Sequence, residues 1–139
     1  MSTEPFPTIR SHLYGPGNNA KILSKIFDTE ADAVILDLED AVPFNQKESA
    51  LNMVAEIIAE IPDNPSSCCF VRINHPSLQL AEKEINAIVQ NGLFGIRIPK
   101  VETPDDIHTV EKFLNAEEKT KNIKAQSIKI ICNIESSKG

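Results

Sequence analysis

The sequence predicts an α/β protein built on a parallel sheet of the (β/α)8 TIM-barrel type. Five short apolar segments, rich in β-branched residues, alternate with four segments whose apolar residues recur at helical spacing. Polar or charged side chains follow each apolar segment, and sites drawn from the ends of several successive strands are typical of barrels. A doubly wound sheet more often has a single site beside a glycine-rich phosphate loop, a pattern that Gly15-Pro16-Gly17 does not match.

The five expected strands are short and apolar. Residues 33–36, Ala-Val-Ile-Leu, form a continuous apolar run of the kind found in strands that are buried on both faces. Pro99 ends the fourth strand, because proline lacks the amide N–H that a strand ladder needs. In chain order, we expect strands at residues 10–14, 33–37, 68–73, 94–98 and 128–134.

The segments between the strands carry helix signals. Asn18 or Asn19 can cap a short first helix, and a second helix is expected over residues 46–60. Thr103, followed by proline and two aspartates, is a strong start for the fourth helix. The apolar stripes of the four helices are Ile22, Leu23, Ile26 and Phe27; Leu51, Val54, Ala55 and Ile58; Ala81, Ile85, Ile88 and Val89; and Ile107, Val110, Phe113 and Leu114.

Length, charge and cysteine usage narrow the class of protein. The chain has 139 residues, enough for a single domain, and a formal net charge of −6 that argues against nucleic acid or an anionic membrane as partner. It contains no apolar run of transmembrane length, and its first residues lack the regions of a signal peptide. Its three cysteines form no C-x-x-C pair, as expected of reduced thiols. We therefore expect a cytoplasmic protein with one domain over residues 1–139.

Three carboxylates follow the second expected strand within four positions: Asp37, Glu39 and Asp40. A buried carboxylate is costly unless it is hydrogen-bonded, paired with a cation or bound to a metal. The group is therefore either a polar site at the carboxyl end of the strand or a solvated turn of the kind that often follows one. The residues alone leave both interpretations open.

Five motifs occur in order along the chain. They are Arg10-Ser-x-Leu-x-x-Pro-Gly17, Asp37-Leu-Glu-Asp-Ala-Val42, Val71-Arg-Ile-Asn74, Pro99-Lys-Val-Glu102 and Ile134-Glu-Ser-x-x-Gly139. In these motifs the chain resembles the HpcH/HpaI aldolase/citrate lyase family, whose members are (β/α)8 barrels that form or cleave carbon–carbon bonds. Asp40 stands where the pyruvate-type aldolases of that family usually carry a histidine. The resemblance is therefore to the citrate lyase β-subunit branch.

The resemblance implies a Mg²⁺-dependent carbon–carbon lyase that cleaves or forms an acyl-CoA thioester of the citryl or malyl type by retro-Claisen or aldol chemistry. Members of the family hold Mg²⁺ with a glutamate after the fifth strand and an aspartate after the sixth. Glu135 matches the glutamate, and the aspartate would lie beyond residue 139. By the same resemblance, Arg72 grips the carboxylate of the product. Glu39 and Asp40 are expected to orient Arg72 or a metal-bound water rather than to bind as direct ligands. Arg10 either touches the substrate at the barrel mouth or seals a strand end.

These residue types suit that chemistry. Mg²⁺ prefers hard oxygen ligands and commonly takes one or two protein carboxylates, which suits Glu135. Arginine presents a planar pair of donors that matches a carboxylate. Structural roles remain open beside the functional ones: Arg72 can pair with Asp37 or Glu39, Glu135 can cap a following helix, and Lys100 can be a local salt-bridge partner.

The length of the chain predicts an incomplete barrel. A (β/α)8 barrel typically needs about 250 residues, so this chain corresponds to about the first five β/α units. Its two outer strands would expose unpaired backbone groups, from which we expect a homo-oligomer or a complementing fragment as partner. Two functions follow. One is a lyase whose site such a partner completes, and the other is a non-catalytic remnant that binds a homologue or a small carboxylic acid.

Overall fold

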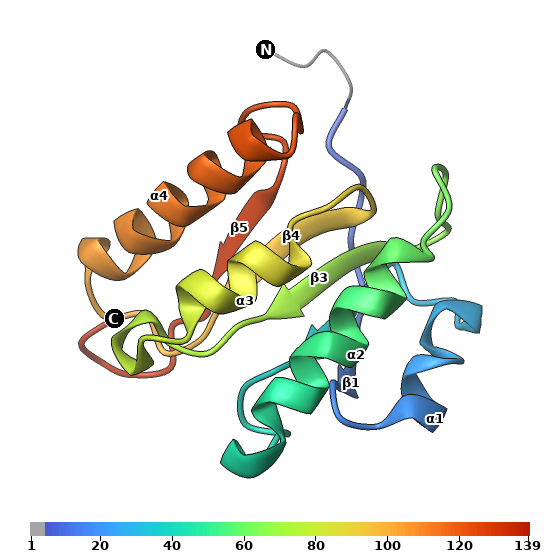
Figure 1. The fold of residues 1–139 in the computed structure, drawn as a ribbon, viewed down its shortest axis with the longest axis horizontal. Helices are drawn as coiled ribbons and strands as arrows, with labels where there is room; N and C mark the ends of the chain where they lie inside the picture. The colour runs from blue at the N-terminus through green and yellow to red at the C-terminus, as the bar shows by residue number, and fades with distance from the viewer. Residues whose placement is uncertain (1–4) are drawn as a thin grey trace.

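The computed structural model describes residues 5–139 and contains a five-stranded parallel sheet (Figure 1). The strands are β1 (His12–Pro16), β2 (Ala33–Asp37), β3 (Cys68–Arg72), β4 (Leu93–Ile98) and β5 (Lys129–Cys132). They lie in chain order, and each pairs in parallel with the next. The predicted parallel α/β sheet is confirmed, with its first strand two residues later than expected.

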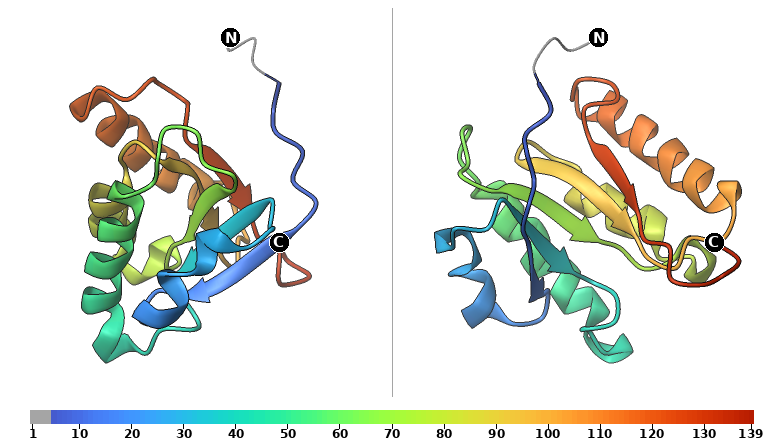
Figure 2. Two further views of the ribbon diagram at one scale, coloured as in Figure 1. Left: turned by 90° about the vertical axis from the view of Figure 1, so that its right-hand side faces the viewer. Right: turned by 180° about the vertical axis from the view of Figure 1, so that it is seen from behind.

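Helices cover one face of this sheet, as the side and rear views show (Figure 2). They are α1 (Ala20–Leu23), α2 (Lys47–Ala59), α3 (Ala81–Ile88) and α4 (Pro104–Thr120). Asn19 caps α1 by accepting a hydrogen bond from Ile22 N at 3.1 Å, and Thr103 forms a capping box with Asp106 at the start of α4. The first apolar stripe is shared between α1 and a 3-10 turn, Ile26–Asp28, because the short helix ends after Leu23.

The main hydrophobic core lies between the sheet and the helices. Alternate side chains of a strand point to opposite faces, so every second strand residue meets the helix layer. Each helix contributes aliphatic side chains to this layer, and the strands contribute Val34, Leu36, Cys69, Val71, Ile96 and Ile98. A smaller cluster of Ala33, Ile35 and Phe70 lies on the opposite face, where Ile9, Phe94 and Ile131 pack against it. None of the helices described over residues 5–139 is long and apolar enough to cross a membrane.

The helix-free face is concave, and we call it the inner face. Arg97 on β4 donates to the Tyr14 hydroxyl at 2.7 Å and to His12 Nδ1 at 3.0 Å, both on β1. Two strands lie between β1 and β4, which would stand about 14 Å apart in a flat sheet. These contacts therefore require the sheet to curl toward this face. Gly95 allows the curl, since a Cβ there would lie 2.5 Å from the Phe70 ring.

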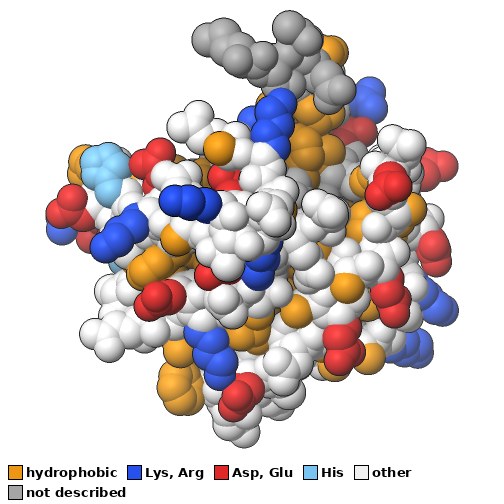
Figure 3. Space-filling model, turned by 45° about the horizontal axis from the view of Figure 1, so that its top comes forward, with side chains coloured by type: hydrophobic (Ala, Val, Ile, Leu, Met, Phe, Trp, Pro, Cys, Tyr) orange, Lys and Arg blue, Asp and Glu red, His pale blue; other side chains and the backbone are white. Residues whose placement is uncertain are grey.

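Charged side chains of both signs are interspersed on the face that Figure 3 shows, with apolar side chains between them. No extended region of one sign is visible on that face. This distribution agrees with an acidic chain of moderate net charge, −6, in which charges of both signs are mixed on that face.

Candidate functional site at the carboxyl edge of the sheet

Charged side chains from four successive strand ends lie together at one edge of the sheet. Parallel strands all end at the same edge, so the residues that follow β2, β3, β4 and β5 become neighbours. Ion pairs and hydrogen bonds join them across as many as 61 positions of sequence. We call this group the carboxyl-edge cluster: Asp37, Glu39, Asp40, Arg72, Lys100 and Glu135.

Arg72 and Asp37 form the buried centre of the cluster. The strand register places them side by side on β3 and β2. Arg72 Nε donates to Asp37 Oδ1 at 2.8 Å and Nη2 donates to Oδ2 at 2.6 Å, which is a two-pronged ion pair. These hydrogen bonds to Asp37 raise the pKa of Arg72, which keeps its charge. The structural pairing considered from the sequence is present, and the contact of Arg72 with a ligand stays a prediction.

The turn after β2 is folded around the Asp37 carboxylate. Glu39 N donates to Asp37 Oδ1 at 3.0 Å and Ala41 N donates to Oδ2 at 3.1 Å, so each oxygen accepts two hydrogen bonds. From the start of α2, Lys47 Nζ donates to the backbone carbonyls of Leu38 at 2.9 Å and Glu39 at 3.0 Å. The backbone of this turn is therefore held on two sides.

Glu39 lies between two cations. Its Oε2 accepts a hydrogen bond from Lys100 Nζ at 3.0 Å, and its Oε1 lies 3.7 Å from Arg72 Nη1 with no hydrogen bond from any residue in 5–139. Lys100 Nζ also contacts Asp40 Oδ1 at 3.2 Å, so Lys100 is the salt-bridge partner that the sequence suggested. Asp37 and Glu39 are 1% and 7% exposed, which excludes a solvated turn for these two, whereas Asp40 is exposed.

The neighbouring carboxyls of Glu39 and Asp40 differ in how readily they bind a proton. Burial raises the pKa of Glu39, and Asp40 adds to this effect while Lys100 opposes it. Hydrogen bonding with Glu39 lowers the pKa of Asp40, and Lys100 lowers it further. Environments that push two carboxyl pKa values apart allow one group to hold a proton while the other stays charged. Glu39 is therefore the member of this pair that takes up a proton first as the pH falls.

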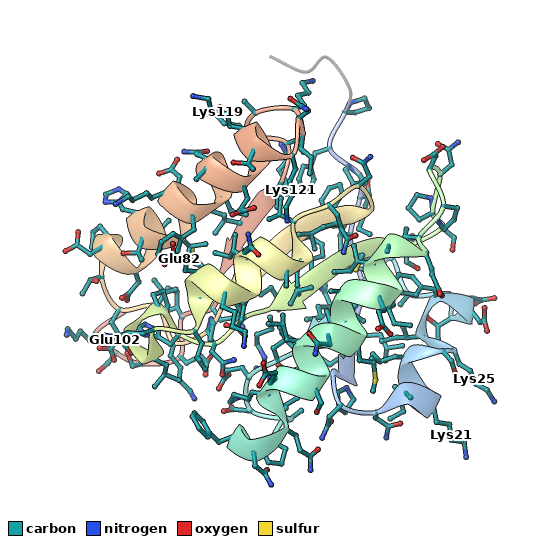
Figure 4. The ribbon with its side chains drawn as sticks, in the orientation of Figure 1. Lys21, Lys25, Glu82, Glu102, Lys119 and Lys121 are labelled. Carbon is teal, nitrogen blue, oxygen red and sulfur yellow. The ribbon has the colours of Figure 1, made fainter. Side chains whose placement is uncertain are left out.

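The loops after β4 and β5 are tied together beside these carboxylates. Lys100 has a backbone φ of 52°, in the left-handed region that lysine rarely adopts, and its N–H donates to Glu135 Oε1 at 3.2 Å. Glu102, labelled in Figure 4, accepts a hydrogen bond from Ser136 Oγ at 3.0 Å and lies 3.4 Å from Lys138 Nζ. Lys100 thus reaches Glu135 through its backbone and Glu39 through its side chain.

Glu135 is an exposed carboxylate with no cation within 4.0 Å among residues 5–139. It offers the hard oxygen donor that Mg²⁺ prefers, and Mg²⁺ commonly takes only one or two protein carboxylates. Glu39 Oε1, which accepts no hydrogen bond within the described chain, is a second oxygen with unused capacity at this edge. These donors fit Mg²⁺ in kind, although residues 5–139 contain no group of three or more His, Cys, Asp or Glu side chains placed to hold a metal.

A buried polar network links the cluster to α3. Asn74 Nδ2 donates to the Leu38 carbonyl at 3.0 Å and to Glu84 Oε2 at 2.7 Å, while Asn74 N donates to Glu84 Oε1 at 3.0 Å. Glu84 is 5% exposed, and its burial raises its pKa to about 7. Asn74, the last residue of the third motif, therefore holds the backbone of the turn after β2 in place.

Arg10 lies at the opposite edge, at the amino ends of β1 and β2. Its Nε and Nη2 donate to Asp32 at 3.2 and 3.1 Å, and its guanidinium is 78% exposed. Asp32 also accepts hydrogen bonds from the backbone N–H groups of Arg10 and Ser11, at 2.8 and 3.2 Å. Contact of Arg10 with a substrate stays a prediction. Its position corresponds to the other expected role, the sealing of a strand end.

Sequence reasoning did not single out Lys47, Tyr14 or Arg97, which adjoin the cluster. The Tyr14 ring centroid lies 5.0 Å from the guanidinium carbon of Arg72 and 5.7 Å from that of Arg97. A signal for Arg97 was available, because it stands in register with Arg72 and in-register residues of parallel strands share a face. A hollow of about 350 Å³ opens beside the Arg72 side chain, and its lining consists of Tyr14, Pro16, Asp37, Ala41 and Arg72.

Comparisons with known proteins indicate the same family as the five sequence motifs. Residues 10–139 match the model of the family described as HpcH/HpaI aldolase/citrate lyase. The chain is 33% identical over 130 residues to the citrate lyase subunit beta of Haemophilus influenzae, covering 94% of this chain and 44% of that protein. It is 35% identical over 100 residues to the human mitochondrial citramalyl-CoA lyase, covering 70% of this chain and 29% of that protein. The chain thus spans less than half the length of these curated relatives.

Solved structures show the same fold. The Haloferax volcanii malate synthase in its ternary complex with pyruvate and acetyl-CoA superposes with a TM-score of 0.84 at 18% identity, over 97% of this chain and 42% of that chain. The citrate lyase beta subunit of M. tuberculosis, complexed with oxaloacetate and magnesium, superposes with a TM-score of 0.67 at 23% identity, over 92% of this chain and 48% of that one. The match of nearly the whole chain to one family model confirms the resemblance that the motifs predicted: the chain belongs to the HpcH/HpaI aldolase/citrate lyase family.

Proposed function

We propose that residues 1–139 form the first portion of a (β/α)8 barrel domain in a Mg²⁺-dependent carbon–carbon lyase that acts on a 3-hydroxyacyl thioester of the citryl-CoA or malyl-CoA type. The supporting observation is the carboxyl-edge cluster, in which an arginine fixed by a buried aspartate stands at the same edge as a free carboxylate, Glu135. Family relatives named citrate lyase subunit beta and citramalyl-CoA lyase give the reaction class.

Arg72 binds the carboxylate of the 2-oxo acid half of the substrate in this proposal. Asp37 occupies Nε and one side of Nη2, so the remaining N–H groups of Nη1 and Nη2 form a second two-pronged edge. Because Asp37 is itself fixed by four hydrogen bonds, the guanidinium is oriented before any ligand arrives. Glu39 and Asp40 complete this orientation by facing Arg72 and by anchoring Lys100.

Glu135 would hold Mg²⁺, and the ion, when bound, polarises the carbonyl of the 2-oxo acid as a Lewis acid. Anchoring of Lys100 by Glu39 and Asp40 keeps its ammonium paired rather than free to compete for Glu135. The family resemblance places a second carboxylate for the metal after a sixth strand, outside residues 1–139. We accordingly expect no lyase turnover from the chain alone.

Binding of oxaloacetate with and without Mg²⁺ tests this proposal. Calorimetric titration of the wild-type chain is expected to show tighter oxaloacetate binding when Mg²⁺ is present. Glu135→Gln should remove the effect of Mg²⁺ while keeping the shape of the side chain. Glu111→Gln, an exposed position on α4, makes the same chemical change away from the cluster and should behave as wild type. Equal affinity with and without Mg²⁺ in all three proteins would overturn the role of Glu135.

The second candidate is a non-catalytic chain that binds a small carboxylic acid. The observation that favours it is the Asp37–Arg72 pair, which can present its donors to a carboxylate without a metal. This candidate predicts oxaloacetate binding that requires Arg72 and ignores Mg²⁺. The same titrations therefore separate the two functions.

A further inference from the structure

A second group of polar side chains lies on the inner face of the sheet, next to the carboxyl-edge cluster. It consists of Arg97 on β4 and of Tyr14 and His12 on β1. Arg97 Nη1 donates to the Tyr14 hydroxyl oxygen at 2.7 Å, and Nη2 donates to His12 Nδ1 at 3.0 Å. The three side chains are thus joined around one guanidinium, and neither Asp37 nor Glu39 contacts that guanidinium.

The hydrogen-bond donors of this group are not all used, and its positive charge is not paired with a carboxylate of residues 5–139. The sequence has three arginines, and Arg97 is the one without a carboxylate within 4.0 Å among residues 5–139. Its Nε is buried and has no hydrogen-bond partner in that part of the chain. An unpaired charge beside an apolar surface is costly, so a counter-charge at this position would stabilise the structure.

The hydroxyl of Tyr14 and the ring of His12 add two more donors. Since the Tyr14 oxygen already accepts from Arg97, its own O–H is left to donate to a further acceptor. His12 Nδ1 likewise accepts from Arg97, which places the proton of the neutral ring on Nε2. Burial lowers the pKa of His12, and the charge of Arg97 lowers it further, so the ring stays neutral. All three side chains can therefore donate a hydrogen bond to a ligand.

The surroundings strengthen interactions with a ligand at this position. Ile35 and Phe70 form an apolar floor on the inner face, and Phe94 packs against Phe70 with ring centroids 5.3 Å apart. Ion pairs and charged hydrogen bonds are stronger beside such a low-dielectric surface than in bulk water. Tyr14 is 39% exposed and His12 is also exposed, so a small molecule can reach the donors.

We propose that Arg97, Tyr14 and His12 form a binding site for a small anion that only accepts hydrogen bonds, namely a carboxylate or a phosphate group. The guanidinium supplies the charge, and Nη1 and Nη2 each keep one N–H beyond those given to Tyr14 and His12. The Tyr14 O–H and the His12 Nε2–H supply the neutral donors. The site adjoins the one that holds Arg72, because the Tyr14 ring also packs on that guanidinium at 5.0 Å, but its charge comes from Arg97 and the proposal does not rest on lyase activity.

The intrinsic fluorescence of the protein comes from Tyr14 alone, because the chain has one tyrosine and no tryptophan. Tyr14 lies beside both Arg97 and Arg72, so the Arg97 variant described below decides which arginine holds the anion. Inorganic phosphate and malonate are titrated separately into the wild-type chain at constant ionic strength, with sodium chloride as the balancing salt. A saturable change in Tyr14 fluorescence is expected with at least one of the two anions. The stronger binder identifies the carboxylate or the phosphate as the preferred group.

Two variants locate the binding. Arg97→Leu removes the guanidinium and should weaken binding of the anion at least tenfold. Lys112→Leu removes one positive charge from an exposed position on α4, on the other side of the sheet, and should bind as wild type. Equal affinities in wild type and Arg97→Leu would overturn the proposal, as would a change in fluorescence that sodium chloride alone reproduces.

A measurement on the wild-type chain keeps the test decisive if Arg97→Leu does not fold. Nuclear magnetic resonance signals of the His12 ring should shift saturably with the same anion and the same affinity that Tyr14 fluorescence reports. Unchanged His12 signals at saturating phosphate and malonate would show that the three donors serve no small anion, and the proposal would fail.

Discussion

Two arginine–aspartate pairs flank β2, one at each end, and they are chemically alike but differently buried. Asp32 precedes the strand and pairs with Arg10, while Asp37 ends the strand and pairs with Arg72. Each arginine donates through Nε and Nη2 to the two oxygens of its aspartate. The exposed fractions of the side chains are 78% and 19% for the Arg10 pair, against 16% and 2% for the Arg72 pair.

The difference teaches that the same pairing geometry can hold an arginine loosely or firmly, depending on burial. Water solvates the Arg10 pair, so each partner can lose the other at little cost. The Arg72 pair is buried beneath the turn after β2, so loss of Arg72 leaves the Asp37 carboxylate without a cation or water to replace it. A buried pair of this kind is fixed in position, which is the property that a binding arginine requires.

The largest effect is expected from removing each arginine in turn. Arg72→Met leaves the Asp37 carboxylate buried without a cation, which should lower the free energy of unfolding by on the order of 3–5 kcal/mol. Arg10→Met should change it little, because Asp32 keeps its backbone hydrogen bonds and regains water. Urea denaturation at pH 7 measures both. Similar losses from the two variants would contradict the role assigned to burial.

Ligand binding should separate Arg72 from a purely structural arginine. Arg72→Lys keeps the charge but loses the two-pronged geometry. A buried charged hydrogen bond left unmade costs on the order of 2–5 kcal/mol, so oxaloacetate affinity should fall by roughly 30-fold to several thousand-fold. Calorimetric titration of the folded fraction provides the measurement.

A structural role gives a different result for the same variant. Arg72→Lys would then melt at a lower temperature while its folded fraction binds oxaloacetate as wild type does. That outcome would remove Arg72 from the proposed binding site. Arg10→Lys serves as the matched control, since Arg10 lies at the opposite edge of the sheet.

Two carboxyls, Glu84 beside the carboxyl edge and Asp32 at the amino edge, should change the stability of the fold with pH in opposite directions. The pKa of Glu84 is raised from 4.5 to about 7, so between these values the folded state holds a proton that the unfolded state has lost. Stability therefore falls as the pH rises through this window, by up to about 3 kcal/mol from this group. Glu84→Gln should abolish that fall, whereas Glu82→Gln, at a neighbouring position on α3 (Figure 4), should preserve it. Identical pH profiles for wild type and Glu84→Gln would refute the assignment.

The order of the elements was predictable from the sequence, and the errors have local causes. Alternation of apolar strands and amphipathic helices determines the order, and carboxyl ends of parallel strands must meet at one edge. β1 was placed two residues early because Gly15-Pro16 was taken for a turn. Pro16 fits at the end of this strand because β1 lies at the edge of the sheet, where one side of the strand needs no ladder partner.

Partners within the site were less predictable. The pairing of Arg72 with Asp37 follows from strand neighbourhood, and it was one of the alternatives considered. Lys100 adopts a left-handed φ and bonds to Glu39 across 61 positions of sequence, and no sequence pattern indicated either feature. The contact of Arg97 with Tyr14 requires the sheet to curl, and curvature is a property of the whole sheet rather than of either strand.

The smallest effect is expected at the amino edge under acid and salt. Hydrogen bonds from Arg10 lower the pKa of Asp32 to about 2. Because this pKa is depressed on folding, its contribution to stability is present above the ordinary aspartate range and is lost as the pH falls toward 2. The stability of Asp32→Asn should therefore resemble that of wild type near pH 2 and differ from it slightly at pH 7.

At pH 7, 1 M sodium chloride should shrink even this difference in stability, since exposed charges are screened over about 3 Å at that concentration. Urea midpoints at the two pH values and two salt concentrations measure it, and a difference that survives 1 M salt would mean that the Arg10 pair is shielded from solvent like the Arg72 pair.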